Sequence, residues 1–359
     1  MNLEKLENIL KGEPKFRLKQ AEKAVFIDLI EDWQETTTLP LELREKLNSL
    51  CPLEIKAEKI ESKDKKTIKA VINLPDGLKV EAVLMMYENR NTVCVSSQVG
   101  CVFACAFCAT GKMGFKRNLT IDEIIEQVLY FARLLAPSRP PANDWHCRAG
   151  SDSGPARRLK FMPSDDANMG ITNIVFMGMG EPFLNYKNVL EAIMILNDQQ
   201  GFGLGARHFS ISTVGVVEGI KKLADEPLQL NLAISLHAPN DELRSKIMPV
   251  NKKYSIKKIL QAVDDYIKKT NRKVMFEYIM IDGVNDSEKQ ARELAELMKK
   301  PLYFVNLIPC NPVGEFKPSL QKKIEKFKKI LLESGVAVNQ RYSFGQDISA
   351  ACGQLAGVA

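Results

Sequence analysis

Residues 94–111 have the sequence CVSSQVGCVFACAFCATG, which contains three closely spaced cysteines after its first residues. Its cysteines Cys101, Cys105 and Cys108 have the spacing C-x3-C-x2-C and directly follow a β-prone run at 92–97. Three thiolates on one short loop are typical of a bound metal or metal cluster. Structural zinc uses four protein ligands, whereas a 4Fe-4S cluster on three cysteines leaves one iron open to a substrate or cofactor. The loop therefore favours a 4Fe-4S cluster.

Beyond this loop, short apolar runs alternate with charged segments of helical periodicity. The runs are ITNIVFMG, HFSIST, LNLAISL, KVMFEYIM and YFVNLIP. Near-continuous apolar strands separated by helices are typical of a parallel sheet covered on both faces. With the strand at 92–97 they make six βα units. The pattern predicts an α/β fold, a partial (βα)6 barrel over residues 91–359, in preference to a doubly wound sheet.

The chain before residue 91 has a different pattern. Residues 1–60 carry apolar side chains at helical spacing among Lys and Glu, which predicts a small N-terminal helical domain. Within 61–90, TIKAVINLP and KVEAVLMMY flank Asp76-Gly77, a dipeptide that favours a tight turn between strands. We therefore expect a β-hairpin extension at 61–90 that leads into the cysteine loop.

Residues 136–170 interrupt the barrel pattern. They contain no Val or Ile and five of the 17 prolines, so they cannot bury much apolar surface. The prediction is a disordered insertion between a helix and the strand ITNIVFMG.

Composition restricts the class of protein. With 359 residues and 45% hydrophobic residues, the chain can form a large core, which excludes a disulfide-stapled mini-protein. No apolar run reaches the roughly 18 residues of a membrane span, and the N-terminus is too charged for a signal peptide. We expect a cytoplasmic protein without membrane contact. The net charge of +6 is compatible with a polyanionic partner but does not require one.

A second motif, Gly178-Met179-Gly180-Glu181-Pro182, follows the second barrel strand. Glycines at a strand end let the backbone approach a ligand, and the carboxylate can accept a hydrogen bond from an ammonium group. Alone, the string is equally compatible with a tight turn before a helix. By the same argument of strand ends, we single out a further set of residues: Ser212, Ser235, Leu236, His237 and Asn311.

The loop spacing C-x3-C-x-aromatic-C resembles the signature of the radical S-adenosylmethionine (SAM) superfamily. The ordered strings CVSSQVGC, GMGEP, SLHAPND, NLIPCNP and DISAACGQLAG resemble the RlmN family of RNA adenine-C2 methyltransferases. Only 136–170 falls outside the resemblance. It implies a 4Fe-4S cluster on Cys101, Cys105 and Cys108, and two SAM molecules per turnover. It also implies SAM contacts from Gly180, Glu181, Ser212, Ser235, Leu236, His237 and Asn311.

The resemblance gives roles to residues that would otherwise look structural. A cysteine at the end of an apolar tail is by default a core residue. The family's cysteine at the place of Cys352 accepts a methyl group from one SAM, and a deoxyadenosyl radical from a second SAM removes a hydrogen from it. The methylene radical then adds to the base. Glu81 matches the general base, and Cys94 the cysteine that releases the product and leaves a disulfide.

The implied substrates are an adenosine of 23S rRNA and the adenosine next to the anticodon in tRNAs. A flavodoxin or ferredoxin is the implied electron donor, and we expect a monomer. The basic residues Lys15, Arg17, Lys19 and Lys23 fit an RNA-binding surface and a solvated helix face equally well. Two alternatives stay open: a Cfr-type methyltransferase acting on carbon 8 of adenine, and a non-catalytic RNA-binding protein with structural zinc.

Overall fold

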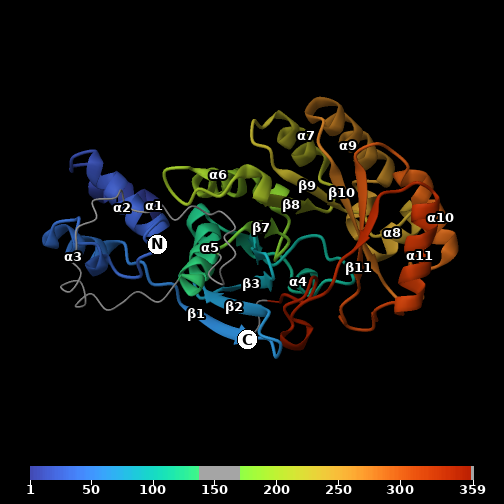
Figure 1. Ribbon diagram of the computed structural model, residues 1–359, viewed down its shortest axis with the longest axis horizontal. Helices are drawn as coiled ribbons and strands as arrows, with labels where there is room; N and C mark the ends of the chain where they lie inside the picture. Colours follow the sequence, from blue (N-terminus) through green and yellow to red (C-terminus); the bar gives the residue numbers. More distant parts are fainter. Residues whose placement is uncertain (137–169, 357–359) are drawn as a thin grey trace.

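The computed structural model describes residues 1–136 and 170–356 (Figure 1). Apart from its two end residues, the insertion predicted at 136–170 lies outside this part of the chain. Three helices begin the chain: α1 (Leu3–Leu10), α2 (Phe16–Phe26) and α3 (Leu41–Leu50). Trp33, which lies between α2 and α3 in the sequence, is fully buried and donates a hydrogen bond from Nε1 to the Cys51 carbonyl at 2.8 Å.

The centre of the molecule is a ten-stranded sheet in the order β1-β2-β3-β4-β7-β8-β9-β10-β11-β12. An antiparallel edge is made by β1 (Ala57–Glu61), β2 (Thr67–Asn73) and β3 (Lys79–Tyr87). β3 pairs antiparallel with β4, and all later neighbours pair parallel. The parallel strands are β4 (Arg90–Cys94), β7 (Asn173–Phe176), β8 (Phe209–Thr213), β9 (Asn231–Ser235), β10 (Val274–Met280), β11 (Tyr303–Pro309) and β12 (Val338–Gln340).

This topology confirms the predicted partial barrel. The six predicted strands are β4, β7, β8, β9, β10 and β11, in consecutive order in the sheet. The turn at Asp76-Gly77 joins β2 to β3, with Gly77 at a φ of 82°. Two strands of this sheet were not predicted: β1 has the polar sequence AEKIE, and β12 is three residues long. Both are edge strands of the sheet, where a polar or short sequence helps to prevent pairing with other chains. Such a strand has no apolar pattern by which it could be predicted.

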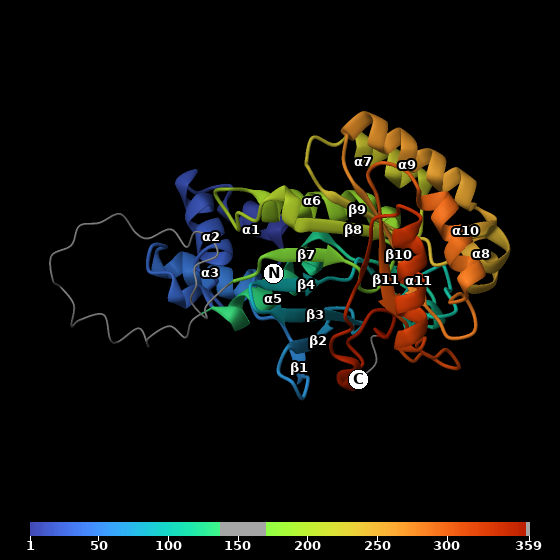
Figure 2. The same ribbon diagram turned by 45° about the vertical axis from the view of Figure 1, so that its right-hand side comes forward.

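Helices cover the outer face of the barrel strands (Figures 1 and 2). Their apolar faces explain this packing: the buried residues of α9 are Ile256, Ile259, Ala262, Val263 and Tyr266. The helices after β4 are α4 (Ala109–Lys112), α5 (Ile121–Leu135), α6 (Tyr186–Asn197), α7 (Val217–Asp225), α8 (Asp241–Ile247), α9 (Ile256–Thr270), α10 (Glu288–Met298) and α11 (Gln321–Glu333).

Contacts with α5 attach the N-terminal helices to the barrel. The Leu3 amide donates to Asp122 at 3.1 Å, and Arg133 Nη1 donates to the Leu53 carbonyl at 2.9 Å. At the other end of the chain, the tail after β12 lies beside β2 and α4 (Figures 1 and 2). Within the described ranges, none of the helices combines the length and the apolar character that crossing a membrane requires.

Candidate active site

The cysteine loop starts where β4 ends, and two short strands on either side of it pair with each other. β5 (Gln98–Val99) pairs with β6 (Arg117–Asn118), so the loop returns beside its own start. Gly100 has a φ of 75°, and a β-carbon there would lie 1.7 Å from the Gly114 carbonyl oxygen, so only glycine fits. The Ala106 amide donates to the Ile247 carbonyl at 2.9 Å, which anchors the loop to the end of α8.

The three loop thiols lie close enough to influence one another. Burial raises the pKa of Cys101 to about 11, and the Cys108 thiol adds to the rise. Burial likewise raises the pKa of Cys105, with further contributions from Cys108 and Cys101. An all-sulfur donor set on one loop fits a 4Fe-4S cluster, which is held by cysteine thiolates. No group of three His, Cys, Asp or Glu in the described part of the chain is arranged around a single metal ion.

Cys94 and Cys352 come together although they stand at opposite ends of the barrel sequence. Burial raises the pKa of Cys94 to about 12, and the neighbouring Cys352 thiol adds to the rise. Cys352 is open to solvent, but loss of hydration to the surrounding protein still raises its pKa to about 11, with Cys108 contributing next. Cys352 therefore lies within electrostatic range of both Cys94 and the cysteine loop.

Backbone contacts hold the segment around Cys352 in this place. The Cys352 carbonyl accepts from Asn311 Nδ2 at 3.0 Å, and the Gly353 carbonyl accepts from the Ala109 amide at 2.7 Å. The Leu355 carbonyl accepts from Thr110 Oγ1 at 2.5 Å. The tail is thus tied to α4, which directly follows Cys108. Asn311, predicted to contact SAM, uses its amide nitrogen on the tail here.

Glu81 lies on the same face of the sheet as Cys94. Val83 pairs directly with Cys94, and Glu81 stands two residues away on β3, where side chains return to the same face. Its carboxylate is buried, 3.3 Å from Lys69 Nζ, and its Oε2 accepts from the Ala356 amide at 3.0 Å. The candidate base is therefore in contact with the tail that carries Cys352.

The GMGEP segment packs tightly against the chain that follows β4. A β-carbon on Gly178 would lie 2.7 Å from the Val95 carbonyl oxygen, and one on Gly180 would lie 2.4 Å from the Gln98 side chain. These glycines allow two loops to approach each other. Glu181 is buried, which raises its pKa to about 7, and its carboxylate accepts from the Phe183 and Val214 amides at 3.1 and 2.9 Å.

The other predicted SAM contacts lie at the ends of β8 and β9. Ser212 and Ser235 approach each other, with 3.4 Å between their hydroxyl oxygens. Leu236 is buried, and its amide donates to the Glu277 carbonyl at 3.1 Å. His237 has a φ of 58°, and its Nδ1 accepts from the Ile279 amide at 3.1 Å. Burial lowers its pKa to about 3, so the imidazole is neutral and packs edge-on against Phe107.

Several buried polar residues of the barrel were missed by sequence reasoning. Lys69 and Glu277 are charged residues within the apolar strands TIKAVIN and VMFEYIM, a signal that could have identified both. Asn306 and Arg341 contact Glu277, and nothing in their local sequence marks them. Arg244 is fully buried and donates five hydrogen bonds to the loops after β8 and β9 and to the segment after α8.

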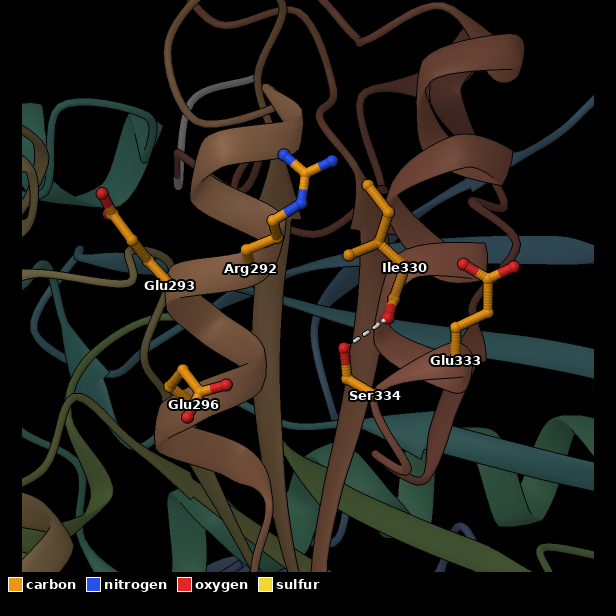
Figure 3. Close-up of a pocket in the computed structure, with 6 residues that line it drawn as sticks. All are labelled: Arg292, Glu293, Glu296, Ile330, Glu333 and Ser334. Carbon is orange, nitrogen blue, oxygen red and sulfur yellow. Dashed lines mark hydrogen bonds between the residues drawn. The ribbon is translucent and has the colours of Figure 1, made fainter.

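A surface pocket lies elsewhere, between α10 and α11 (Figure 3). Arg292, Glu293 and Glu296 come from α10, and Ile330, Glu333 and Ser334 come from α11 or its C-cap. The Ser334 hydroxyl is already bonded to the Ile330 carbonyl at 2.8 Å. None of the candidate site residues lines this pocket.

Comparison with known proteins identifies the family of this chain. Residues 160–295 match the Radical SAM superfamily. A protein of Chloroflexus aurantiacus named "Probable dual-specificity RNA methyltransferase RlmN" is 43% identical, covering 99% of this chain and 91% of its own length. The "Ribosomal RNA large subunit methyltransferase N" of Nitrosopumilus maritimus is 41% identical, covering 96% and 93%. The chain belongs to the RlmN family.

A solved structure supports this assignment to the RlmN family. The crystal structure of a radical SAM methyltransferase from Sphaerobacter thermophilus superposes with a TM-score of 0.87 at 41% identity, covering 100% of this chain and 98% of that one. The family consists of enzymes that combine an iron-sulfur cluster with SAM. Membership therefore excludes the alternative of a non-catalytic zinc protein.

Proposed function

We propose that this enzyme methylates carbon 2 of an adenosine in 23S rRNA and of the adenosine next to the anticodon in tRNAs. One observation supports the proposal: the tail around Cys352 bonds both to α4, directly after the cysteine loop, and to Glu81. The Cys352 thiol also lies within electrostatic range of Cys94. A carrier thiol, a resolving thiol and a base are the groups that the family's chemistry requires. The names of the relatives at about 40% identity support RNA as the substrate.

Cys101, Cys105 and Cys108 are the residues that would hold the 4Fe-4S cluster. When bound, the cluster and SAM supply a 5′-deoxyadenosyl radical, with an electron from a flavodoxin or ferredoxin. Gly180, Glu181, Ser212, Ser235, Leu236, His237 and Asn311 are the proposed SAM contacts. Carbon 2 of adenine is electron-poor and does not attack a sulfonium methyl group, so a radical route is required.

Cys352 carries the methyl group in this proposal. Its thiolate displaces the methyl from one SAM, which leaves as S-adenosylhomocysteine. A second SAM is consumed to remove a hydrogen atom from the S-methyl group, and the carbon so activated bonds to carbon 2 of the adenine. The exposure of Cys352 suits this role, because both SAM and an RNA base have to reach its sulfur.

Glu81 and Cys94 complete the turnover. Glu81 takes the proton from carbon 2, and its carboxylate is held in the interior 3.3 Å from Lys69 Nζ. The adduct also gives up one electron, which would return to the oxidised cluster. The Cys94 thiolate then attacks the Cys352 sulfur, and the carbon that leaves takes up a proton, which frees the methylated base and leaves a Cys94–Cys352 disulfide. A dithiol reductant or its cellular equivalent has to reduce this disulfide before the next turnover.

Each of the three parts of the chain has its own function in this reaction. The helical domain at 1–60 would contribute RNA contacts, the hairpin at 61–90 presents Glu81, and 91–359 forms the catalytic barrel. The adenine has to leave its stack to reach Cys352, which costs a few kcal/mol and less in a loop. We place the enzyme in the cytoplasm as a monomer.

Mass spectrometry of nucleosides tests this function. The protein is reconstituted anaerobically with iron, sulfide, SAM and a reductant, and incubated with 23S rRNA fragments or tRNA. The expected product is 2-methyladenosine, and it should be absent with Cys352→Ala. Formation of 8-methyladenosine would favour the Cfr-type alternative, and the absence of any methylated adenosine would contradict the proposal.

A further inference from the structure

A second group of polar side chains lies inside the barrel next to Cys352. Glu277 on β10 accepts a hydrogen bond at Oε1 from Asn306 Nδ2 of β11 at 2.9 Å. Arg341, directly after β12, places Nη1 3.7 Å from Glu277 Oε2. The charges of Glu277 and Arg341 lie within electrostatic range of the Cys352 thiol. Asn311, which follows β11, bonds to the Cys352 carbonyl at 3.0 Å and so brings the tail to the same end of the barrel.

One of the two carboxylate oxygens of Glu277, Oε2, has no hydrogen bond in the described part of the chain. Its side chain is only 3% exposed, and Oε2 is buried with no hydrogen-bond donor within reach in the described residues. The Arg341 nitrogen is too distant for a hydrogen bond, although the two charges attract each other. A buried acceptor without a donor is destabilising, and a ligand carrying an N–H group would recover this loss.

Arg341 shows from which side such a ligand would come. Its side chain is 38% exposed, whereas Glu277 is buried, so the pair extends from the barrel interior toward solvent. Arg341 Nη1 also contacts Met177 Sδ at 3.5 Å, which places the guanidinium across the barrel near the end of β7. A planar ligand that approaches Cys352 from solvent would thus meet a donor and a buried acceptor side by side.

We propose that Glu277 and Arg341 recognise the target adenine through its 6-amino group and an adjacent ring nitrogen. This inference rests on the proposed function and assigns its base specificity. Adenine presents a 6-amino donor beside the acceptor N7, which complements a carboxylate beside a guanidinium. Guanine presents the acceptor O6 at that position, which the carboxylate oxygen repels. Glu277 Oε2 therefore selects a purine with a 6-amino group and orients it toward Cys352.

The test uses two synthetic RNA substrates that differ by one functional group. One contains the target adenosine, and the other contains purine ribonucleoside at that position, which lacks the 6-amino group. The wild-type holoenzyme should prefer the adenosine RNA by about 10- to 100-fold in kcat/KM, the range for one good base contact. Glu277→Ala should reduce this preference to about threefold or less, because the amino group loses its acceptor.

Two further variants control for the loss of side-chain volume and for the loss of a buried carboxylate elsewhere in the protein. Glu277→Met keeps the volume of the side chain without an acceptor, and it should lose the preference in the same way. Glu123→Met removes a different buried carboxylate, paired with Arg117 at 2.7 Å, and should retain the full preference. Methylation of Cys352 by SAM in the absence of RNA, followed by intact-protein mass, should be unchanged in both Glu277 variants.

Each result has a distinct meaning. An unchanged preference in both Glu277 variants would overturn the recognition role while leaving the proposed function intact. Loss of Cys352 methylation without RNA would place Glu277 at SAM instead, and would also overturn it. A wild-type enzyme that forms no methylated adenosine would refute the proposed function itself, so the two failures can be told apart.

Discussion

At the scale of single residues, the site depends on five thiols that differ in their surroundings. Cys101, Cys105 and Cys108 influence one another on one loop, whereas Cys94 is buried at a strand end and Cys352 is open to solvent. The same functional group can therefore serve as a cluster ligand, a methyl carrier or a resolving nucleophile. Substitution of one thiol from each of these three roles should block a different step.

Cys105→Ala tests the cluster ligands. Removing one of three thiolates should abolish iron binding, and with it the formation of 5′-deoxyadenosine. Iron content, visible absorption and deoxyadenosine are measured after anaerobic reconstitution. Cys51→Ala is the matched control, since this buried thiol lies among the N-terminal helices and bonds to the Asn2 carbonyl. Full iron content together with normal deoxyadenosine in Cys105→Ala would disprove the ligand assignment.

The roles of Cys94 and Cys352 are separated by trapping. Cys94→Ala should still cleave SAM but should leave RNA attached to Cys352 through a methylene thioether, because no thiol releases it. Cys352→Ala should attach nothing. Denaturing gels should show a nuclease-sensitive, reductant-resistant shifted band for Cys94→Ala only. Free turnover by Cys94→Ala, or an adduct with Cys352→Ala, would mean that the two roles are assigned wrongly.

Glu81→Gln tests the base. The amide keeps the size of the side chain but cannot take the carbon 2 proton, so product formation should fall by about 100-fold or more while SAM cleavage continues. Glu58→Gln is a suitable control, because Glu58 is exposed on the edge strand β1, which β2 separates from the strand of Glu81. Single-turnover assays follow both products. Equal rates of methylation in wild type and Glu81→Gln would rule out Glu81 as the base.

At the scale of elements, Arg244 on α8 joins loops that carry the proposed SAM contacts. Its guanidinium donates to the carbonyls of Val214, Ser235 and Leu236, and all of these bonds are buried or half-buried. Arg244→Met should lower the free energy of unfolding by about 3–5 kcal/mol, because several buried acceptors lose their donor. Denaturant unfolding of the reconstituted enzyme measures this loss.

Arg292→Met provides the comparison for Arg244. Arg292 is exposed on α10 and pairs with Glu288 at 3.2 Å, so its removal should change the free energy of unfolding by less than about 1 kcal/mol. Equal effects of the two substitutions would contradict the idea that Arg244 organises the strand ends.

Element patterns also explain what the sequence could predict. The barrel strands are nearly continuous apolar runs, and Asp76-Gly77 marks its turn, so both were predictable. Contacts between distant elements were not. Glu81 meets the Ala356 amide, and Glu277 meets Arg341, only because the tail folds back over the sheet. The periodicity of apolar residues indicates which side of a helix or strand is buried. It does not indicate which residues of a distant helix, strand or loop contact that side.

At the scale of the whole molecule, the N-terminal helices offer a surface for RNA outside the barrel. Lys15, Lys19 and Lys23 are exposed and recur every four residues, hence on one side of α2, although Lys23 pairs with Asp28 at 2.8 Å. The double variant Lys15→Gln/Lys19→Gln should bind RNA several-fold more weakly. Its slope of log affinity against log salt should be smaller by about 1–2, as expected for two lost phosphate contacts.

The control for this surface is Lys257→Gln/Lys258→Gln on α9, which removes two exposed lysines from the outer layer of the barrel. Fluorescence anisotropy of labelled RNA at several salt concentrations compares the two double variants. If both weaken binding equally, the effect is one of net charge, and α2 has no special part in RNA binding.

The central claim is that Cys352 delivers the methyl carbon to adenine by a radical route. The most direct measurement uses SAM with a trideuterated methyl group and follows deuterium by mass spectrometry. Our account predicts that the adenine methyl group retains two deuterium atoms and that 5′-deoxyadenosine gains one, both lost with Cys352→Ala. A product with all three deuterium atoms and unlabelled 5′-deoxyadenosine would show direct methyl transfer from SAM and would contradict the account.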